Sequence, residues 1–431
     1  MHLEQTIEPA GRSVWRSLAA SDTGKAAGLA GATIASNVIA LVFTVVFARL
    51  LGASGYGSLA ALVSAFIILM VPGSALQIAV AREVSRDVAG GSPDAGAGVR
   101  RWLARLALAA LVVAAVAIPL RGAIAAAINV DELWAAAVVP VSSMLWAMVS
   151  VLRGALQGFG DYRAVGVSIV GEAMSRLLFA LALVALGLDV TGAFLGIPLA
   201  LVAVGAVLAM RLLPRLPPPS GRFEPARLRD LLAGARAPVL ALTLVFALQE
   251  VHIIVVKHEA TSDAAGSYAV AAVAAKAIIW VAIGLGLYLL PEASRRTKIG
   301  VDARPILLRT LGLIAACAAA MVAIFAVGGE PLLAAVFGDD LTEASGALVW
   351  LGLAMSLLAC TYLSVQYLLA LGRSSFIWIL AFVAALEVAL LAGVGADLEG
   401  IAFALFALQL GCAAVMLIVS FRTSGPAPGR G

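Results

Sequence analysis

The sequence predicts an all-α integral membrane protein with about 12 transmembrane helices. Of its 431 residues, 62% are hydrophobic and only 13% are charged, whereas a soluble domain carries about 25% charged residues. Its apolar runs are about 20 residues long, which is the length that spans a bilayer as a helix. These runs lack the two-residue alternation that is typical of transmembrane strands, so we do not expect a barrel.

An internal repeat supports this fold class and adds symmetry to it. Residues within the stretch 238–298 match residues within the stretch 26–86 at a constant offset of 209, so that Gly57 corresponds to Gly266. The matched sequences are GSLA with GSYA, and REVSR with PEASR. The chain therefore contains two copies of one membrane-spanning unit.

Six apolar spans can be placed in each copy, at 26–48, 58–80, 102–120, 134–152, 164–186 and 192–210, and at 238–256, 266–290, 306–328, 344–370, 375–393 and 401–421. An even number of spans gives both copies the same orientation, related by an axis along the membrane normal. We therefore expect two pseudo-symmetric six-helix lobes around a central cavity. The expected segments are a cytoplasmic N-terminal segment (1–25), an N-lobe (26–210), a cytoplasmic Pro- and Arg-rich linker (211–237), a C-lobe (238–421) and a cytoplasmic tail (422–431).

The distribution of Lys and Arg predicts a multi-pass protein of the plasma or inner cell membrane with both termini in the cytoplasm. Nearly all of the 29 Lys and Arg residues fall on one side of the expected spans, which the positive-inside rule places in the cytoplasm. The exceptions lie on the opposite side or within spans: Arg49, Arg121 and Lys257, and Arg176 and Lys276.

Several classes of function are not expected. The net charge of +4 follows from the charges of the loops, so we expect no nucleic-acid partner. The three cysteines, Cys317, Cys360 and Cys412, lie within apolar spans without a CxxC pair, which favours inert thiols. The sequence has no HExxH, GxSxG or P-loop motif. We therefore expect neither an enzyme nor a metal or cofactor, apart from a coupling H⁺ or Na⁺.

Glu250 and Lys276 are the strongest candidates for a functional site, because both lie inside apolar spans. A charge at membrane depth costs about 2.5–3.5 kcal/mol on translocon scales, so it usually faces the bundle interior. The two residues lie at similar depth on consecutive spans, and an ion pair between them is expected. Lys257 shares the helix face of Glu250. Two interpretations remain: a cavity site for an anionic substrate or a coupling ion, or a structural lock.

Glu172 and Arg176 lie four residues apart in the fifth span, the spacing of an intrahelical ion pair. A direct role in substrate binding is the alternative interpretation. Glu387 stands alone in the eleventh span, which corresponds to the fifth. A lone buried carboxylate tends to take up a proton, which suits ion coupling, and pairing with an arginine is the alternative. The ion-coupling candidates are therefore Glu172, Glu250 and Glu387.

Pro72 and Gly73 lie in the middle of the second span, and Gly284 and Gly286 lie in the same region of the eighth. Proline removes a backbone hydrogen bond and glycine has no side chain, so both weaken a helix. These residues are hinge candidates for alternating access. Close packing through small residues is the other interpretation.

Arg49 stands at the outer end of the first span, within FARLLGASGYG. One interpretation is that its side chain reaches toward the membrane interface. The other is a contact with phosphate, because the forked guanidinium group matches phosphate geometry.

Four stretches carry a resemblance to a known family. FARLLGASGYGSLAALVSAF followed by AREVSR resembles its opening helical pair, and VVKHEATSDAAGSYAVAAVAAKAIIW followed by LLPEASRR resembles its seventh and eighth helices. VLRGALQGFGDYR is similar to its fourth-to-fifth loop, and EPLLAAVFGDDLTEASGAL to the outer loop before its tenth helix. This is the polysaccharide transporter family, the O-antigen-type oligosaccharide flippases of the multidrug/oligosaccharidyl-lipid/polysaccharide exporter superfamily.

The resemblance implies a V-shaped bundle that moves lipid-linked oligosaccharide, a polyprenyl-diphosphate glycan, to the outer leaflet for surface polysaccharide biosynthesis. It implies alternating access coupled to an ion gradient. The implied partners are membrane lipid, the glycan carrier, and a polysaccharide polymerase or glycosyltransferases. By position, Lys276 and Arg49 are the candidates for the sugar diphosphate, and Glu250 and Glu387 for ion coupling. Further cavity candidates for substrate binding are Glu250, Lys257 and Arg176.

Three alternatives remain open. A cation-coupled multidrug extruder of the same fold would have an apolar, acidic cavity without basic residues. A lipid II flippase would have fourteen helices and several cavity arginines. A non-transporting scaffold of a glycan synthase would tolerate neutral replacements of Glu250 and Lys276.

Overall fold

The computed structural model describes residues 22–92, 95–217 and 225–423. Most of the expected N-terminal and C-terminal segments, and the linker residues 218–224, lie outside the described residues. The described part of the chain contains helices and no strand. The α-helices are α2 (Asp22–Ala89), α3 (Ala97–Ala117), α4 (Arg121–Ile128), α5 (Leu133–Gly158), α6 (Tyr162–Ala185), α7 (Asp189–Leu212), α8 (Pro225–Glu259), α9 (Ser262–Ala275), α10 (Ala277–Lys298), α11 (Arg304–Phe337), α12 (Leu348–Ala370), α13 (Ile377–Val394) and α14 (Leu398–Arg422). Three 3₁₀ turns connect them: η1 (Leu213–Arg215), η2 (Asp339–Leu341) and η3 (Glu343–Ala347).

The longest helix, α2, is broken at Gly52. This glycine has a φ of 67° and a ψ of −177° inside an otherwise helical run, a conformation that glycine adopts without steric cost. Before the break, Ala32 lies against Gly166 and Phe43 lies against Arg176. Residue numbers rise together in both contacts, so this half of α2 runs parallel to α6.

The half of α2 after the break runs the other way. Gly73 packs against Ala147, and Val84 packs against Gly158, so this half is parallel to α5. Helices α5 and α6 are antiparallel, because a turn of only a few residues joins them. The chain therefore reverses at the break, and α2 contains two spans.

The prediction of about twelve spans in an all-helical membrane fold is confirmed. In the described residues, 10 helices are long and apolar enough to cross a membrane, and α3 and α4, bent by 83°, form an eleventh candidate. The segment Gly28–Ala89 counts once among the 10, although it crosses twice because of the break at Gly52. Two six-span sets result, as the repeat predicts.

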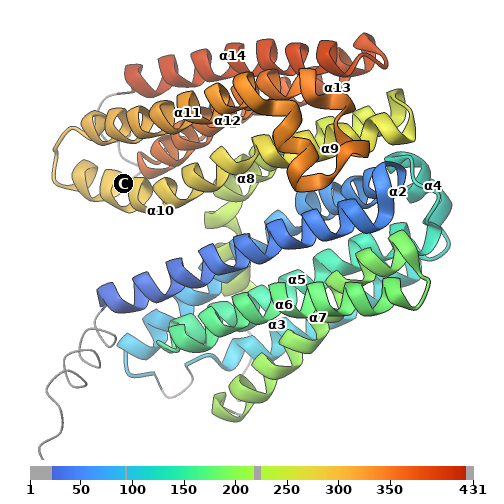
Figure 1. The fold of residues 1–431 in the computed structure, drawn as a ribbon. Coiled ribbons are helices and arrows are strands. Elements are labelled where there is room, and N and C mark those ends of the chain that lie inside the picture. Colours follow the sequence, from blue (N-terminus) through green and yellow to red (C-terminus); the bar gives the residue numbers. More distant parts are fainter. Residues whose placement is uncertain (1–21, 93–94, 218–224, 424–431) are drawn as a thin grey trace, which may run out of the picture.

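Figure 1 shows these helices as two bundles, α2 to α7 (blue to green) and α8 to α14 (yellow to red). We call them the first and second bundle. The most buried spans of the two bundles are α5 and α12, each the fourth span of its copy. Each bundle thus builds its core around the same member of the repeat.

The two bundles touch where the repeat places equivalent residues. A Cβ on Gly57 would lie 3.0 Å from the backbone nitrogen of Gly266, and a Cβ on Gly266 would collide with the carbonyl oxygen of Ala53. Helices approach this closely only where small residues meet. Because Gly57 and Gly266 correspond in the repeat, their contact lies beside the pseudo-two-fold axis.

We call the two ends of the molecule the Gly52 end and the linker end. The Gly52 end carries Gly52, α4 and the turn between α8 and α9; the linker end carries the connection between α7 and α8. At the linker end η1 extends α7, and α8 begins at Pro225, so helix enters the expected linker 211–237 from both sides.

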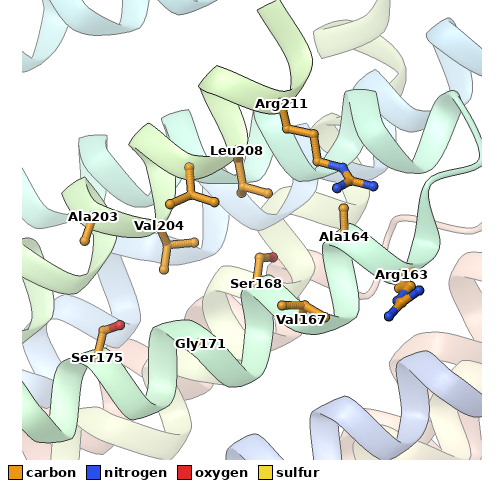
Figure 2. Close-up of a pocket in the computed structure, with 11 residues that line it drawn as sticks. Arg163, Ala164, Val167, Ser168, Gly171, Ser175, Ala203, Val204, Leu208 and Arg211 are labelled. Atoms are coloured by element: carbon orange, nitrogen blue, oxygen red, sulfur yellow. The ribbon is translucent and has the colours of Figure 1, made fainter.

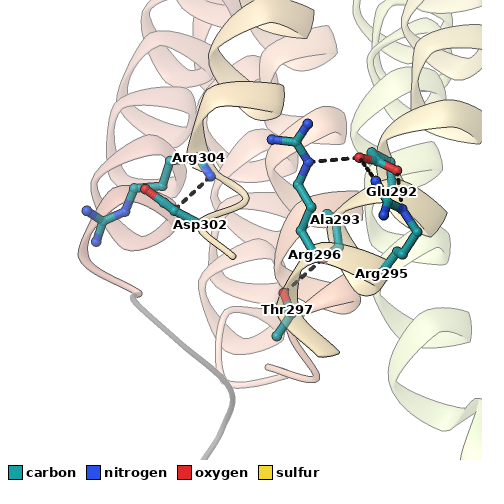
Figure 3. A network of polar contacts seen from close by, with 7 residues as sticks. All are labelled: Glu292, Ala293, Arg295, Arg296, Thr297, Asp302 and Arg304. Carbon is teal, nitrogen blue, oxygen red and sulfur yellow. Dashed lines mark hydrogen bonds and ion pairs between the residues drawn. The ribbon is translucent and has the colours of Figure 1, made fainter. Parts of the chain in front are cut away.

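At the linker end, a polar network joins side chains in the last turns of the eighth span (Figure 3). Glu292 accepts hydrogen bonds from Arg295 at 2.8 and 2.7 Å and from Arg296 at 2.8 Å. The matched residue of the first copy, Glu83, pairs with Arg86 at 3.9 Å. The repeated acidic and basic residues therefore form the same local pairing in both bundles.

Candidate functional site

The eighth span is interrupted at Lys276, which stands between the end of α9 and the start of α10. The side chain is buried, and its Nζ donates to Oε2 of Glu250 at 2.8 Å. The ion pair that the sequence predicts is therefore present. The interruption is local, because Lys276 keeps a right-handed helical backbone (φ −67°, ψ −11°) and its N–H donates to the carbonyl oxygen of Ala272 at 2.9 Å.

The carboxylate of Glu250 also joins the two bundles. Its side chain lies on α8 and is 2% exposed. Oε2 accepts a second hydrogen bond from Oγ of Ser64 on α2 at 2.7 Å, and Oε1 accepts one from Nε2 of Gln249 at 2.9 Å. Breaking a buried pair by removing one partner leaves an uncompensated charge, which costs about 3–5 kcal/mol. The site is thus satisfied as long as the bundles stay together here.

A second polar cluster lies deeper in the second bundle. Glu387 on α13 is fully buried, and its Oε2 accepts a hydrogen bond from Nε2 of Gln409 on α14 at 3.3 Å. In the described part of the chain, Oε1 of Glu387 and Oε1 of Gln409 are buried without a hydrogen-bond partner. An unpaired buried carboxylate is costly, and these two oxygen atoms are of the kind that a proton or a cation would satisfy. No group of three or more His, Cys, Asp or Glu side chains suited to a metal ion occurs among the described residues.

His252 and Tyr268 lie between the two clusters. Nδ1 of His252 lies 3.1 Å from the Tyr268 hydroxyl, and Nε2 lies 3.0 Å from the carbonyl oxygen of Gln249. Both side chains are fully buried. They therefore connect the Gln249–Glu250 region of α8 with the interior of the second bundle.

Arg49 crosses between the bundles at the Gly52 end. Its Nε and Nη2 donate to the carbonyl oxygens of Val336 and Ala335 at 3.1 and 2.7 Å. These are the last carbonyls of α11, and a cation there also complements the helix dipole. The side chain thus fastens the two bundles together.

Lys257 lies in the same end region, at the end of α8. Its Nζ donates to Oγ of Ser262 at 3.3 Å, and its carbonyl oxygen accepts a hydrogen bond from Asn129 of the first bundle. His258 adds a contact of 3.2 Å with the carbonyl oxygen of Ala126. The structure therefore places Lys257 in the contact between bundles, away from the carboxylate of Glu250.

The expected intrahelical pair of Glu172 and Arg176 is not formed, which corrects that prediction. Nη2 of Arg153 on α5 lies 2.9 Å from Oε2 of Glu172. The same guanidinium group donates to the side chain and carbonyl of Ser168. Arg176 instead lies over the ring of Phe43, 5.2 Å from its centroid. Glu172 therefore pairs with Arg153 on the neighbouring helix α5, and not with Arg176 four residues further along α6.

The hinge candidates lie in continuous helix. A Cβ on Gly73 would lie 3.0 Å from Cα of Ala147, and one on Gly286 would lie 2.8 Å from the ring of Tyr362. A Cβ on Gly284 would meet nothing within 4 Å. Close packing therefore accounts for Gly73 and Gly286, and bending at these positions and at Pro72 stays a prediction.

Ser64 and Arg153 bind the carboxylates of Glu250 and Glu172, and the sequence analysis does not single them out. Serine in a membrane span is common, and nothing in its spacing distinguishes Ser64. Arg153 directly follows the predicted fourth span (134–152), on the side that the positive-inside rule makes cytoplasmic, yet in the structure it is 3% exposed. A possible signal was its position inside the helical run LRGALQG of the fourth span, ahead of the turn.

Comparisons with known proteins agree with this fold. A family model described as polysaccharide biosynthesis protein matches residues 24–291. No curated protein matches the chain in sequence.

Several solved structures share its architecture. An inward-facing multidrug resistance MATE family transporter of the MOP superfamily has a TM-score of 0.75 at 12% identity, covering 90% of this chain and 94% of its own. The lipid II flippase MurJ in an inward closed conformation has a TM-score of 0.71 at 13% identity, covering 92% and 87%. An outward-facing MATE family transporter has a TM-score of 0.61 at 13% identity, covering 94% and 96%.

Proposed function

The chain belongs to the polysaccharide biosynthesis protein family, within the multidrug/oligosaccharidyl-lipid/polysaccharide exporter superfamily, and from this premise we propose that it is a flippase. Its cargo is a polyprenyl-diphosphate-linked oligosaccharide, which it moves from the inner to the outer leaflet of the plasma or inner membrane. The glycan then serves surface polysaccharide biosynthesis, where a polymerase or glycosyltransferases use it.

One observation carries this proposal: the buried pair of Lys276 and Glu250 lies at the junction of the bundles. The carboxylate of Glu250 accepts hydrogen bonds from Lys276 in one bundle and Ser64 in the other. Ionisable groups inside a membrane usually serve substrate or ion pathways. Lys276 supplies the cation that an anionic headgroup needs, which argues against an extruder of cationic drugs.

The pair also offers a way for cargo to loosen the bundle contact. A diphosphate brings more negative charge to Lys276 than one carboxylate does, so it displaces Glu250. The displaced carboxylate is then without its cation, which is costly in this environment. Once it moves away from Lys276 it holds Ser64 less strongly, and binding of cargo thereby favours separation of the bundles.

The conformation supports loading from the linker end. Three hydrogen bonds join the bundles at the Gly52 end, through Arg49, Asn129 and His258. By the positive-inside rule, the linker end is cytoplasmic. In this proposal, the described state is the one that receives cargo from the inner leaflet.

Ion coupling belongs to the second bundle in this proposal. Glu387 and Gln409 each present a buried oxygen atom without a partner. Uptake of H⁺ or Na⁺ between them neutralises the site and changes the packing of α13 against α14. Since α13 also packs against α8, the change reaches the helix that carries Glu250.

Reconstitution of the purified protein tests the proposal. Proteoliposomes receive undecaprenyl diphosphate that carries a biotinylated sugar, and streptavidin reports the fraction exposed on the outer surface. We expect wild-type protein to speed equilibration between leaflets. The double variant Lys276→Met/Glu250→Gln, which keeps the site neutral and similar in volume, should slow it at least tenfold.

Arg309→Gln is the matched control, because Arg309 is an exposed cation on α11 of the same bundle. It should transport at the wild-type rate. Wild-type transport by the double variant would assign the ion pair a purely structural role. Absence of transport by folded wild-type protein would favour the scaffold function instead.

A further inference from the structure

A separate groove lies on the first bundle between α6 and α7, away from the ion pair. Its volume is about 600 Å³, and the residues that line it, shown in Figure 2, include Arg163, Val167, Gly171, Val204 and Arg211. Helices α6 and α7 pack against α2 and α5 of their own bundle. The groove is therefore open to the surroundings of the bundle.

The groove is polar at one end and apolar along its length. Figure 2 shows Arg163 and Arg211 at the same end and Ser175 and Ala203 at the other. Twelve residues separate Arg163 from Ser175, and at 1.5 Å per residue the groove follows α6 for about 18 Å. A hydrocarbon core is about 30 Å thick, so this length is close to the depth of one leaflet.

The polar end carries an excess of positive charge. Arg211 and Arg215 both donate to Oδ2 of Asp161, at 2.8 and 3.0 Å. Partial burial alone would raise the pKa of the Asp161 carboxyl, but hydrogen bonds from Arg211, the Ala164 N–H and Arg215 bring the pKa below its ordinary value. The polar end thus has one carboxylate, Asp161, and three guanidinium groups, those of Arg163, Arg211 and Arg215. The Arg211 side chain remains 49% exposed, so it has room for an anion.

The apolar walls face lipid. Val167 and Val207 are 66% and 60% exposed at the groove, which water would disfavour and acyl chains would not. In Figure 1 α6 and α7 lie on the side of the first bundle away from the second bundle, with α2 between. The occupant therefore arrives laterally from the membrane.

We propose that this groove binds one anionic phospholipid of the leaflet at the linker end. Its phosphate lies between Arg163 and Arg211, and one acyl chain follows Val167, Gly171 and Val204. Arginine suits phosphate because its planar fork donates two hydrogen bonds at once. Free phosphate would leave the apolar walls uncovered, and a zwitterionic lipid would leave the charge excess uncompensated. The groove is a site for bulk lipid, distinct from the path of the cargo.

Native mass spectrometry of the detergent-purified protein tests this site, with phosphatidylglycerol, phosphatidylcholine and inorganic phosphate titrated separately. We expect one phosphatidylglycerol to bind at least tenfold more tightly than phosphatidylcholine. Arg163→Gln/Arg211→Gln should remove this preference. Gly171→Leu should weaken binding without changing charge, since a Cβ at Gly171 meets nothing within 4 Å and the longer side chain fills the groove.

Two variants provide matched controls. Arg309→Gln removes an exposed cation from the second bundle, and Gly411→Leu adds the same bulk at another open glycine; both should bind lipid as the wild type does. Equal binding of both lipids by the wild type, or wild-type affinity in the arginine and Gly171 variants, would overturn the proposal. So would displacement of the bound lipid by undecaprenyl phosphate, which would make the groove a cargo site, or by inorganic phosphate alone.

Discussion

At the scale of single residues, the molecule keeps charge inside the membrane by pairing it across helices. Glu250 has three hydrogen-bond donors, from Lys276, Gln249 and Ser64. A fully satisfied network of this kind is stable, whereas a partly satisfied one is worse than an apolar core. Removal of one charge should therefore cost more than removal of both.

The stability of variants at this pair tests that expectation. Lys276→Met leaves a buried carboxylate without its cation and should lower the free energy of unfolding by about 3–5 kcal/mol. The double variant Lys276→Met/Glu250→Gln should recover most of the loss, because no net charge remains. Unfolding of the detergent-purified proteins in sodium dodecyl sulfate measures both. A double variant as unstable as the single variant would show that the two charges do not compensate each other.

At the scale of helices, glycine decides how closely the bundles meet. The crossing of α2 and α9 has Gly57 on one side and Gly266 on the other, and a Cβ on Gly266 would collide with the carbonyl oxygen of Ala53. Packing of this kind has no space for a larger residue. The crossing should therefore separate when a side chain is added, while each helix remains intact.

Gly266→Val should open the Gly52 end. Spin labels at Gly122 on α4 and Asp340 in η2, in a background without cysteines, report the distance across that end by double electron–electron resonance. We expect a longer distance in Gly266→Val, because the bundles cannot close over the added methyl groups. Gly312→Val is the control, since a Cβ there meets nothing within 4 Å. An unchanged distance in a folded Gly266→Val protein would contradict a role for this crossing in closure.

At the scale of the whole molecule, two similar bundles carry different chemistry. The first copy has Leu41 and Ile67 where the second has Glu250 and Lys276. Glu387, which is fully buried and has one carboxylate oxygen without a hydrogen-bond partner, also belongs to the second bundle. We therefore expect one bundle to bind the coupling ion and the other to supply the opposite wall of the cargo path.

Glu387→Gln should separate transport from its driving force. The amide neither takes up a proton nor attracts a cation, so net movement of the biotinylated carrier should no longer respond to an imposed H⁺ or Na⁺ gradient. Equilibration without a gradient should persist, since the cargo site is intact. Proteoliposomes with imposed gradients measure both. Glu399→Gln, an exposed carboxylate of the same bundle, is the control, and a normal gradient response in Glu387→Gln would place coupling elsewhere.

The fold class, the internal repeat and the expected pairing of Glu250 with Lys276 follow from the amino-acid sequence alone. A long apolar run in lipid has no alternative to the α-helix, because each of its backbone groups must be hydrogen-bonded within the segment itself. Depth along a helix follows from residue number at 1.5 Å per residue. Glu250 and Lys276 carry opposite charges at equal depth on consecutive spans, and an ion pair between them is therefore predictable from sequence.

Contacts between residues on helices far apart in the chain depend on how the helices pack, and the amino-acid sequence does not predict them. Ser64 donates a hydrogen bond to Glu250, and Arg153 forms the ion pair with Glu172. Arg49 donates to carbonyl oxygens in the last turn of α11. These contacts depend on the rotation of each helix about its axis and on which helices are neighbours. In spans that are apolar on all sides, the sequence has no hydrophobic face to define that rotation, so packing alone selects the partners.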